Sequence, residues 1–310
     1  MIYTCTMNPA IDLFVEMETF VVDEVNRSKY EEYQANGKGI NVSIVLKQLG
    51  IDSMVLGFLG GFSGQFIKDS LDDLLINNNF IVVDGITRIN TFVQSINGEY
   101  KVVNRGPEIF LGDQEKLLCQ LEQLNANDVL FVNGSLPKGI DGSILLKISE
   151  VSLKNGFKLV WDISHPILKE LVEYKPYLIK PNIDEFRKIF LKEDAINDEK
   201  VIEKAKSLVS KGVENILIST GEKGAWFVNE SMVLESNAPS GKVVNTACSG
   251  DTLLATFYAT YQASGDAKYS LKKAVAAGSS TAFRPGLTDF TDVESLMGNI
   301  TVSNHKQEGV

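Results

Sequence analysis

The sequence predicts an α/β fold in which a mostly parallel sheet is covered by helices on both faces. Short apolar runs rich in β-branched residues are typical of buried strands, and they occupy residues 2–7, 54–59, 80–83, 129–133, 158–162, 177–180 and 215–219. Segments with apolar residues three and four positions apart, such as 66–75 and 202–208, lie between these runs and indicate amphipathic helices. Because strands and helices alternate, we expect the strands to pair in parallel beneath the helices.

Two regions depart from this alternation. Residues of about 13–35 and 91–104 show polar alternation without a helical pattern, and the second contains an Asn97-Gly98 hairpin turn. We expect them to form a small antiparallel sheet beside the main body, half solvated unless it covers a site or pairs with a second copy of the chain. No linker or fixed-period repeat divides the chain, so 1–310 is expected to be one domain, with a frayed tail after Met297.

The composition disfavours several classes of protein. The chain has 40 acidic and 30 basic residues, and its formal net charge is -10. Nucleic-acid affinity is built from clustered Lys and Arg, so we expect no nucleic-acid partner. No apolar stretch reaches the ~20 residues that cross a bilayer, so we expect no membrane partner. Cys5, Cys119 and Cys248 lack CxxC spacing, which fits a reducing cytoplasm rather than a disulfide framework or a zinc site.

The first candidate motif is NGKGIN at residues 36–41, directly before a helical run. Two glycines around a lysine allow close backbone approach and bring N–H groups and a cation to a ligand. A plain turn before a helix has the same pattern. The motif is not the GxxxxGK[ST] loop of many nucleotide-binding proteins. No GxGxxG follows the first predicted strand, which disfavours a dinucleotide-dependent dehydrogenase.

The second candidate motif is NTACSGDT at residues 245–252, at the entry to an apolar helical run. Small residues at a helix start can present several backbone N–H groups to an anion, and the acid Asp251 would lie within reach of the group that attacks this anion. Alternatively, Asp251 is an ordinary cap that satisfies free donors of the first turn.

Further charged and polar residues stand close behind predicted strands. Ligands of open parallel sheets bind at the carboxyl ends of the strands, so these positions are candidate ligand contacts. Each one taken alone is also compatible with a surface charge or a loop. The residues are Asp12, Arg88, Lys138, Asn182, Glu185 and the stretch 219–224.

The order of the motifs along the whole chain resembles the ribokinase-like, or PfkB, family of carbohydrate kinases, and within it the branch that phosphorylates sugar phosphates. The matching pieces are NPAID at 8–12, NGKGIN at 36–41, TRIN at 87–90, GSLPKG at 134–139, KPNIDE at 180–185, STGEKG at 219–224 and SGD at 249–251. The resemblance implies a Rossmann-like body that binds ATP and a small β-sheet lid over the sugar, formed by the segments at about 13–35 and 91–104.

The resemblance also implies the chemistry. Asp251 is expected to be the catalytic base that takes the proton of the acceptor hydroxyl, while the loose transition state of phosphoryl transfer requires mainly positioning and charge neutralisation. Backbone N–H groups of Cys248, Ser249, Gly250 and Asp251 are expected to form an anion hole. Asn182 and Glu185 match the element that organises Mg²⁺, through water.

The remaining roles implied by the resemblance concern the two substrates. The residues expected to bind sugar hydroxyls are Asp12, Gly37 and Asn41. Those expected to neutralise the phosphate already on the sugar are Arg88, Lys138 and Lys38. The nucleotide site is expected at Lys180, Asn182, Ser219, Gly221, Gly224, Ala277 and Gly278.

The expected reaction is transfer of phosphate from ATP to D-fructose 1-phosphate, giving fructose 1,6-bisphosphate. Tagatose 6-phosphate and fructose 6-phosphate are alternative acceptors. Another alternative is a catalytically weakened sugar-phosphate sensor, because Cys248 stands where the family has glycine. If the backbone there needs a positive φ, a side chain costs on the order of 1 kcal/mol and narrows the anion hole.

Overall fold

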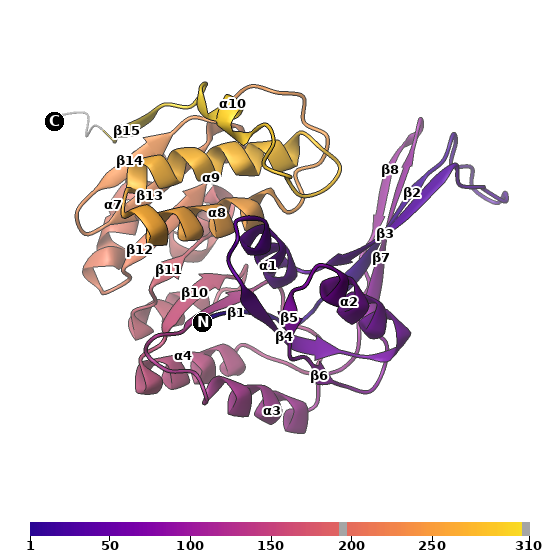
Figure 1. Ribbon diagram of the computed structural model, residues 1–310, viewed down its shortest axis with the longest axis horizontal. Coiled ribbons are helices and arrows are strands. Elements are labelled where there is room, and N and C mark those ends of the chain that lie inside the picture. The colour runs from indigo at the N-terminus through magenta and orange to yellow at the C-terminus, as the bar shows by residue number, and fades with distance from the viewer. Residues whose placement is uncertain (192–196, 306–310) are drawn as a thin grey trace.

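The computed structural model describes residues 1–191 and 197–305, and its centre is an eleven-stranded sheet (Figure 1). The parallel part runs in the order β12-β11-β10-β9-β1-β4, and two short strands, β5 and β6, pair with β4 at the edge. The bounds are β1 (Ile2–Thr6), β4 (Ser53–Leu59), β5 (Asn77–Asn78), β6 (Ile81–Val82), β9 (Val129–Asn133), β10 (Lys158–Asp162), β11 (Leu178–Ile179) and β12 (Asn215–Ser219). The expected mostly parallel α/β sheet is confirmed.

The other edge of the sheet is antiparallel. It consists of β13 (Ala225–Asn229), β14 (Val233–Ser236) and β15 (Val302–Asn304). The expectation of a frayed tail after Met297 is therefore wrong up to Asn304, because Val302 to Asn304 pair with β14 and gain ladder hydrogen bonds. Residues 306–310 lie outside the described residues.

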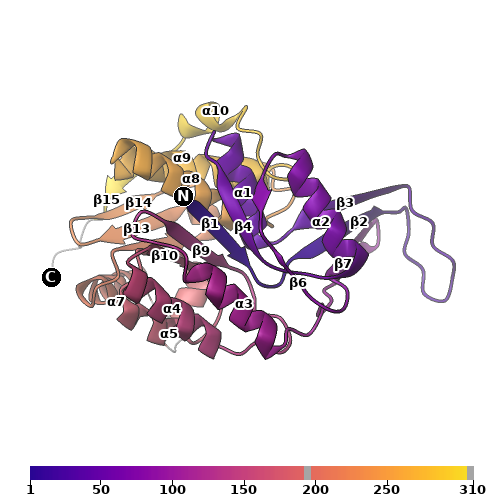
Figure 2. The ribbon, with the colours of Figure 1, turned by 60° about the horizontal axis from the view of Figure 1, so that its bottom comes forward.

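Helices cover both faces of the main sheet (Figure 2). On β10 the side chains alternate, so that Trp161 belongs to one apolar core and Val160 to the other. The helices beside the first core are α3 (Leu111–Leu121), α4 (Ser143–Asn155), α5 (Leu168–Leu171), α6 (Ile183–Phe186) and α7 (Asp198–Ser210), and those beside the second are α1 (Lys38–Gln48), α8 (Ser249–Ser264), α9 (Ala267–Ala282) and α10 (Val293–Met297). A smaller third core lies between α1 and α2 (Gly61–Asp73). Three short helical turns complete the set: η1 (Val172–Tyr174), η2 (Arg187–Leu191) and η3 (Gly221–Lys223).

A four-stranded sheet projects from this body (Figure 1). Its order is β3-β2-β7-β8, and its strands are β2 (Ala10–Glu16), β3 (Tyr30–Asn36), β7 (Arg88–Ser95) and β8 (Gly98–Val102). The outer pairs β2–β3 and β7–β8 are antiparallel, but β2 and β7 pair in parallel, so the expected antiparallel sheet is wrong at its centre. The chain passes through the main body between β3 and β7, and β7 therefore enters the small sheet in the same direction as β2. The sheet begins at Ala10 and Arg88, a few residues before the segments expected from the sequence. The hairpin reverses at residues 96 and 97, and Gly98 already pairs with Ser95. Polar residues at the starts of β2 and β7 thus belong to the small sheet itself.

The carboxyl edge of the main sheet brings polar residues into one row. Thr6 is paired with Asn133 and Asn133 with Asp162, so the last residues of three neighbouring strands lie side by side. Next to Thr6, Gly57 has a φ of 141°, and a Cβ there would lie 2.0 Å from the Thr6 carbonyl oxygen. The close approach of β4 to β1 therefore requires glycine at this point. Within the described residues, the helices are all too short or too polar to cross a membrane.

Candidate active site

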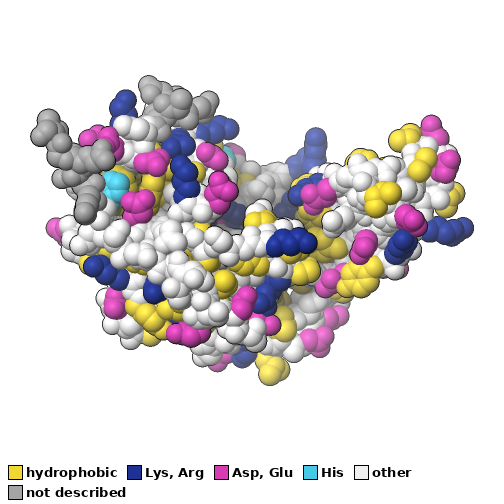
Figure 3. Space-filling view, turned by 90° about the horizontal axis from the view of Figure 1, so that it is seen from above, with side chains coloured by type: hydrophobic (Ala, Val, Ile, Leu, Met, Phe, Trp, Pro, Cys, Tyr) yellow, Lys and Arg dark blue, Asp and Glu magenta, His cyan; other side chains and the backbone are white. Residues whose placement is uncertain are grey.

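A cavity of about 1830 Å³ lies at this carboxyl edge, bounded by the small sheet and by the N-terminus of α8. The surface is hollowed between the body and the projecting sheet (Figure 3). Pockets for one small ligand usually measure roughly 300–1,000 Å³, so this cavity has room for two ligands side by side. The expected site residues that line it are Asp12, Gly37, Lys38, Asn41, Arg88, Lys180, Asn182, Glu185, Ser219, Gly221, Gly224, Cys248, Ser249, Gly250, Asp251 and Gly278.

Asp251 lies in the first turn of α8 and is 4% exposed. The Asn41 side-chain amide, from α1, donates to its Oδ2 at 2.8 Å. Burial raises the pKa of Asp251 to about 7, the nearby negative charge of Asp162 adds to this rise, and Lys38, Asn41 and Lys180 oppose it. A carboxyl group with a pKa near neutrality is well suited to accept a proton and release it again.

Asp162 is buried and binds two lysines. Lys38 Nζ lies 3.1 Å and Lys180 Nζ 3.2 Å from the same oxygen, Oδ1. Burial opposes ionisation of Asp162, but the two ammonium groups outweigh it and hold its pKa below the usual value. The pKa of Lys38 is raised, chiefly by Asp162. These three side chains together carry one positive charge in excess, which favours an anionic ligand beside them.

The cationic cluster adjoins the start of α8. A Cβ added to Gly250 would lie 3.2 Å from Lys180 Nζ, so the glycine allows the ammonium group to approach the helix start. The first N–H groups of a helix have no partners inside it, and they attract anions together with the helix dipole. Lys180 and the first turn of α8 therefore face the same part of the cavity.

Cys248 caps α8 with a φ of 63° and a ψ of −6°. The backbone at Cys248 does have a positive φ, so this side chain carries a strain of about 1 kcal/mol. Burial, and next the charge of Asp251, raise the pKa of the thiol to about 12, and Asn41 Nδ2 lies 3.2 Å from Sγ. The thiol is therefore neutral near pH 7 and a poor nucleophile.

On the small sheet, Asp12 is held from two sides. Asn36 Nδ2 donates to its Oδ2 at 2.6 Å and Asn90 Nδ2 to its Oδ1 at 2.8 Å. Arg88 donates to the carbonyl oxygens of Asn8, at 2.8 Å, and Pro9, at 3.3 Å. Among the described residues, no acidic side chain lies within salt-bridge distance of Arg88. Its positive charge at the cavity wall is therefore available to an anionic ligand.

Loops behind β11 and β12 form the opposite wall. Gly221 has a φ of 63° and Gly224 a φ of 107°, and a Cβ on Gly224 would lie 2.1 Å from the Ser236 carbonyl oxygen. On α9, Gly278 packs against the start of α8, where a Cβ would lie 3.1 Å from the Ser249 carbonyl oxygen. These glycines let the chain segments around the cavity approach one another closely.

Two expected site residues do not line the cavity. Lys138 is 60% exposed and forms a salt bridge with Glu108, because its loop turns the side chain away toward that carboxylate. Ala277 is fully buried on α9, and only its neighbour Gly278 reaches the cavity wall. Neither side chain reaches a ligand bound in the cavity as the structure stands.

Asn182 and Glu185 form a reciprocal cap at the start of α6. The Asn182 side chain accepts from the Glu185 amide at 2.8 Å, the Glu185 carboxylate accepts from the Asn182 amide at 2.8 Å, and Ser164 also donates to Glu185. No group of three metal-ligating residues occurs in the described part of the chain. Mg²⁺ usually keeps several waters and binds one or two carboxylates together with substrate phosphates, so a single fixed carboxylate at the wall fits a hydrated Mg²⁺.

Several residues of the site were not assigned from the sequence. Asp162 is the last residue of a predicted strand, and this position at the carboxyl edge could have revealed it. Asn36 and Asn90 lie inside the quoted motifs, but their contacts to Asp12 depend on strand pairing that the motifs do not show. Asn133 lines the cavity from the end of β9.

Phosphoryl transfer needs from a protein mainly two positioned substrates and donors for anionic charge. The fold and the cavity provide these, which defines an enzyme of the phosphotransferase class. A model of the pfkB family of carbohydrate kinases matches residues 6–293, and the chain belongs to this family. The expected family and the expected ATP-dependent sugar-phosphate kinase activity are thereby confirmed.

Named relatives resemble the chain over its whole length. A D-tagatose-1-phosphate kinase of Bacillus licheniformis is 43% identical over 304 residues, which cover 98% of this chain and 100% of the relative. A 1-phosphofructokinase of Borreliella burgdorferi is 36% identical over 306 residues, covering 98% and 99%. The crystal structure of phosphofructokinase-2 from Escherichia coli has a TM-score of 0.88 over 96% of this chain and 98% of that chain; at 23% identity the similarity concerns the fold.

Proposed function

We propose that the protein transfers the γ-phosphate of ATP to the free primary hydroxyl of a ketohexose 1-phosphate, with D-fructose 1-phosphate as acceptor and fructose 1,6-bisphosphate as product. The observation that carries the proposal is the position of Asp251, a buried carboxyl group with a pKa of about 7 between the polar residues of the small sheet and the start of α8. A relative named 1-phosphofructokinase whose match covers 98% of the chain supports the choice of acceptor.

Asp251 acts as the general base. Its carboxylate takes the proton of the acceptor hydroxyl, the hydroxyl oxygen forms a bond to the γ-phosphorus, and the bond from this phosphorus to the bridging oxygen of ADP breaks. Asn41 holds the carboxylate through a 2.8 Å hydrogen bond. Its near-neutral pKa allows Asp251 to give up the proton after the transfer.

The transferred phosphoryl group lies at the start of α8. Backbone N–H groups of Gly250 and Asp251 donate to its oxygens, while the amide of Ser249 lies 3.4 Å from the Thr246 carbonyl oxygen. The strained cap at Cys248 directs the start of the helix into the cavity. Lys38 and Lys180 add positive charge from the side of Asp162. This arrangement supports a role of Lys38 at the transferred phosphate rather than only at the phosphate already on the sugar.

The small sheet binds the acceptor and acts as its lid. Asn36 and Asn90 each donate one hydrogen bond to the Asp12 carboxylate, and the remaining lone pairs of this carboxylate accept hydrogen bonds from sugar hydroxyls. Gly37 and Asn41 line the same side of the cavity. Arg88 pairs with the phosphate on the sugar. The support for this division is that these residues line the cavity from the small sheet and the start of α1.

The nucleotide occupies the opposite side, against Ser219, Gly221, Gly224 and Gly278. Asn182 and Glu185 would hold a hydrated Mg²⁺ on the nucleotide side of the cavity. When bound, this ion neutralises charge that develops on the phosphates during the transfer. Lys180 extends from the end of β11 toward the same phosphates.

A second candidate acceptor is D-tagatose 1-phosphate. It differs from fructose 1-phosphate only in the direction of one hydroxyl, so the same base, anion hole and phosphate contact would serve it. The 43% identity to a D-tagatose-1-phosphate kinase favours this candidate specifically. Discrimination between the two epimers would depend on hydrogen bonds from the Asp12 side, since a site built to bind a hydroxyl rejects a misplaced one.

The test is an assay of ADP release with Mg²⁺-ATP and, in turn, fructose 1-phosphate, tagatose 1-phosphate, fructose 6-phosphate and tagatose 6-phosphate. We expect the highest kcat/KM with a ketohexose 1-phosphate. The matched control is Asp251→Asn, which retains the shape of the side chain but cannot act as the base. Higher kcat/KM with a 6-phosphate would overturn the choice of acceptor. Binding without turnover of any sugar phosphate would instead indicate a sensor.

The small sheet also supports an association of two copies of the chain. Large apolar side chains are exposed on it, among them Tyr33 (54%), Tyr100 (40%) and Val102 (54%). Pairing of two such sheets would cover these side chains. Light scattering during size-exclusion chromatography should give twice the 34.1 kDa of one chain. A mass of one chain at the working concentration would overturn this proposal.

A further inference from the structure

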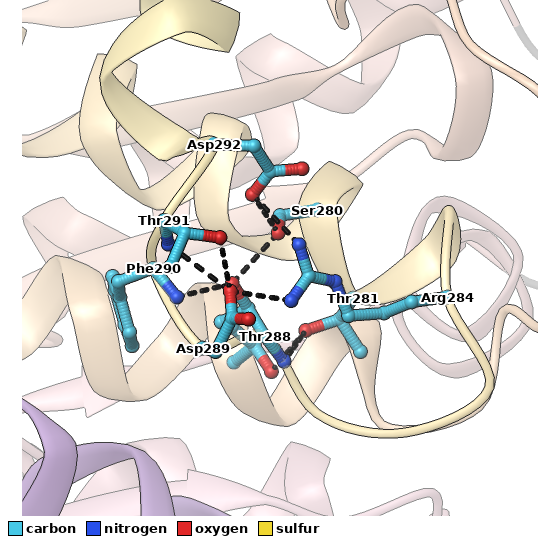
Figure 4. Close-up of polar contacts among 9 residues, drawn as sticks. Ser280, Thr281, Arg284, Thr288, Asp289, Phe290, Thr291 and Asp292 are labelled. Atoms are coloured by element: carbon cyan, nitrogen blue, oxygen red, sulfur yellow. Dashed lines mark hydrogen bonds and ion pairs between the residues drawn. The ribbon is translucent and has the colours of Figure 1, made fainter.

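A network of polar side chains connects the C-terminal end of α9 with the loop that follows it (Figure 4). Arg284 forms salt bridges with Asp289, at 2.5 Å, and with Asp292, at 3.0 Å. Ser280 donates to Asp292 at 2.5 Å and lies 2.7 Å from the hydroxyl of Thr288. The proposed mechanism uses none of these residues.

The network continues from there to the first turn of α8. The Thr288 amide donates to the Thr281 hydroxyl at 3.1 Å, and this hydroxyl lies 3.0 Å from that of Thr252. Thr252 in turn donates to the carbonyl oxygen of Cys248 at 3.1 Å. We call Thr252, Thr281, Thr288, Ser280 and Asp292 the hydroxyl chain. Its four hydroxyl groups belong to residues that are at most 1% exposed.

The direction of each hydrogen bond is fixed, because a hydroxyl group has a single proton. Thr252 donates its proton to the Cys248 carbonyl, so the proton between the two threonines comes from Thr281. At the other end Ser280 donates to Asp292, so the proton between Ser280 and Thr288 comes from Thr288. Thr288 therefore donates two hydrogen bonds: its amide donates to Thr281 and its hydroxyl donates to Ser280.

A second connection joins α9 to the segment before the anion hole. The amides of Val244 and Asn245 both donate to the carbonyl oxygen of Ala282, at 2.8 and 3.1 Å. The backbone at Cys248 is thus held from two sides by the end of α9, through Ala282 and through Thr281. A strained residue such as Cys248 keeps its conformation only when its surroundings determine it strongly.

We propose that the hydroxyl chain, anchored by Arg284, holds the strained backbone at Cys248 and thereby positions the N–H groups of the anion hole. Thr281, Thr288 and Arg284 are positioning residues for phosphoryl transfer, although none of them touches a substrate. The proposal rests on the proposed function in one respect, namely that the transferred phosphoryl group lies at the start of α8.

The test replaces single hydroxyl groups at nearly constant volume. Thr281→Val removes the acceptor of the Thr288 amide and the donor to Thr252, whereas Thr281→Ser keeps both. The matched control is Thr256→Val on α8: Thr256 is fully buried as well, and its hydroxyl has no hydrogen-bond partner among the described residues. This control leaves the hydroxyl chain intact.

We expect Thr281→Val to lower kcat about tenfold, below the roughly 10²-fold loss of a complete oxyanion donor, because the donors are displaced rather than removed. KM for ATP and for the sugar phosphate should stay within about twofold. Thr281→Ser should restore kcat, and Thr256→Val should leave it unchanged. A kcat of Thr281→Val within twofold of the wild type, or an equal loss in Thr256→Val, would overturn the proposal.

Two further measurements keep the result interpretable. If Thr281→Val does not fold, Arg284→Met tests the outer end of the network, and an unchanged kcat there would contradict the proposal. Hydrogen exchange at the Thr252 amide, which donates to the Cys248 carbonyl at 3.0 Å, needs no substrate. It should be at least tenfold faster in Thr281→Val than in Thr256→Val, and equal rates would contradict the positioning role. This readout is valid whichever sugar phosphate the enzyme uses, and also if it uses none.

Discussion

Asp162 should control the pH at which Asp251 becomes an active base. Only the ionised carboxylate of Asp251 can take a proton, so kcat/KM of the wild type should fall as the pH drops below about 7, the raised pKa of this group. Asp162 contributes to the raised pKa through its negative charge, and it also partly neutralises Lys38 and Lys180. Asp162→Asn removes the negative charge and leaves both ammonium groups without it. Both effects lower the pKa of Asp251.

The size of the effect follows from the ionised fraction of Asp251. With a pKa of about 7, roughly a tenth of the Asp251 carboxyl groups are ionised at pH 6. A charge in direct proximity shifts a pKa by about 1–3 units, and a fall of about one unit would ionise half of them. The ratio of kcat/KM at pH 6 to its plateau value should therefore rise about fivefold. This ratio is independent of any loss in the plateau itself.

The assay is a series of kcat/KM measurements from about pH 5 to pH 9 with the preferred sugar phosphate, since kcat/KM reports groups of the free enzyme. The matched control is Asp128→Asn. Asp128 is 6% exposed and pairs with the N-terminal amine at 3.0 Å, at the other end of β9. In Asp128→Asn, kcat/KM should still begin to fall near pH 7. If kcat/KM of Asp162→Asn falls at the same pH as in the wild type, or at a higher pH, the electrostatic account of Asp251 is wrong.

Three other substitutions test separate parts of the site. Asp251→Asn should keep binding of ATP and of the sugar phosphate but lower kcat by ~10² or more; turnover within a few fold of the wild type, measured at saturation, would reduce Asp251 to a helix cap. Arg88→Ala should weaken sugar-phosphate binding by about 1.5–3 kcal/mol in calorimetry; an equal loss for ATP would speak against its role at the acceptor. Cys248→Val should have a free energy of unfolding, measured in urea, about 1–2 kcal/mol below that of Cys248→Gly, because a β-branched side chain is strained at a φ of 63°; equal free energies of unfolding would show that the strain is relieved.

The sequence predicted the parallel half of the main sheet well and the antiparallel edge poorly. The central strands are nearly continuous apolar runs because helices cover both of their faces, and this pattern is readable locally. β13 was not recognised, although Ala225 to Val228 are buried. β15 depends on a partner far away in the sequence, since Val302 pairs with Ser236. Polar tail residues that pair at an edge carry no local signal.

Motif positions predicted most of the cavity wall, but they did not predict contacts between motifs. Asp251 and Asn41 were both assigned, whereas their hydrogen bond arises from the packing of α1 against α8. Lys138 lies inside a matching motif and was expected at the site, but its side chain turns toward Glu108. Side-chain direction in a loop depends on neighbours that the motif does not contain. The charge state of Asp162 likewise follows from two lysines distant in sequence.

The division of the cavity wall between two sheets affects how such an enzyme can evolve and be redesigned. Asp12 and Arg88 belong to the small sheet, while Asp251 and Lys180 belong to the main body. In the proposed function, substitutions in the strands of the small sheet would therefore alter which sugar is accepted, while Asp251 and Lys180 on the main body would stay in place. One scaffold can be fitted to new acceptors by successive changes in a single, separately paired sheet. A chimaera that exchanges β2, β3, β7 and β8 between two such kinases should transplant acceptor preference.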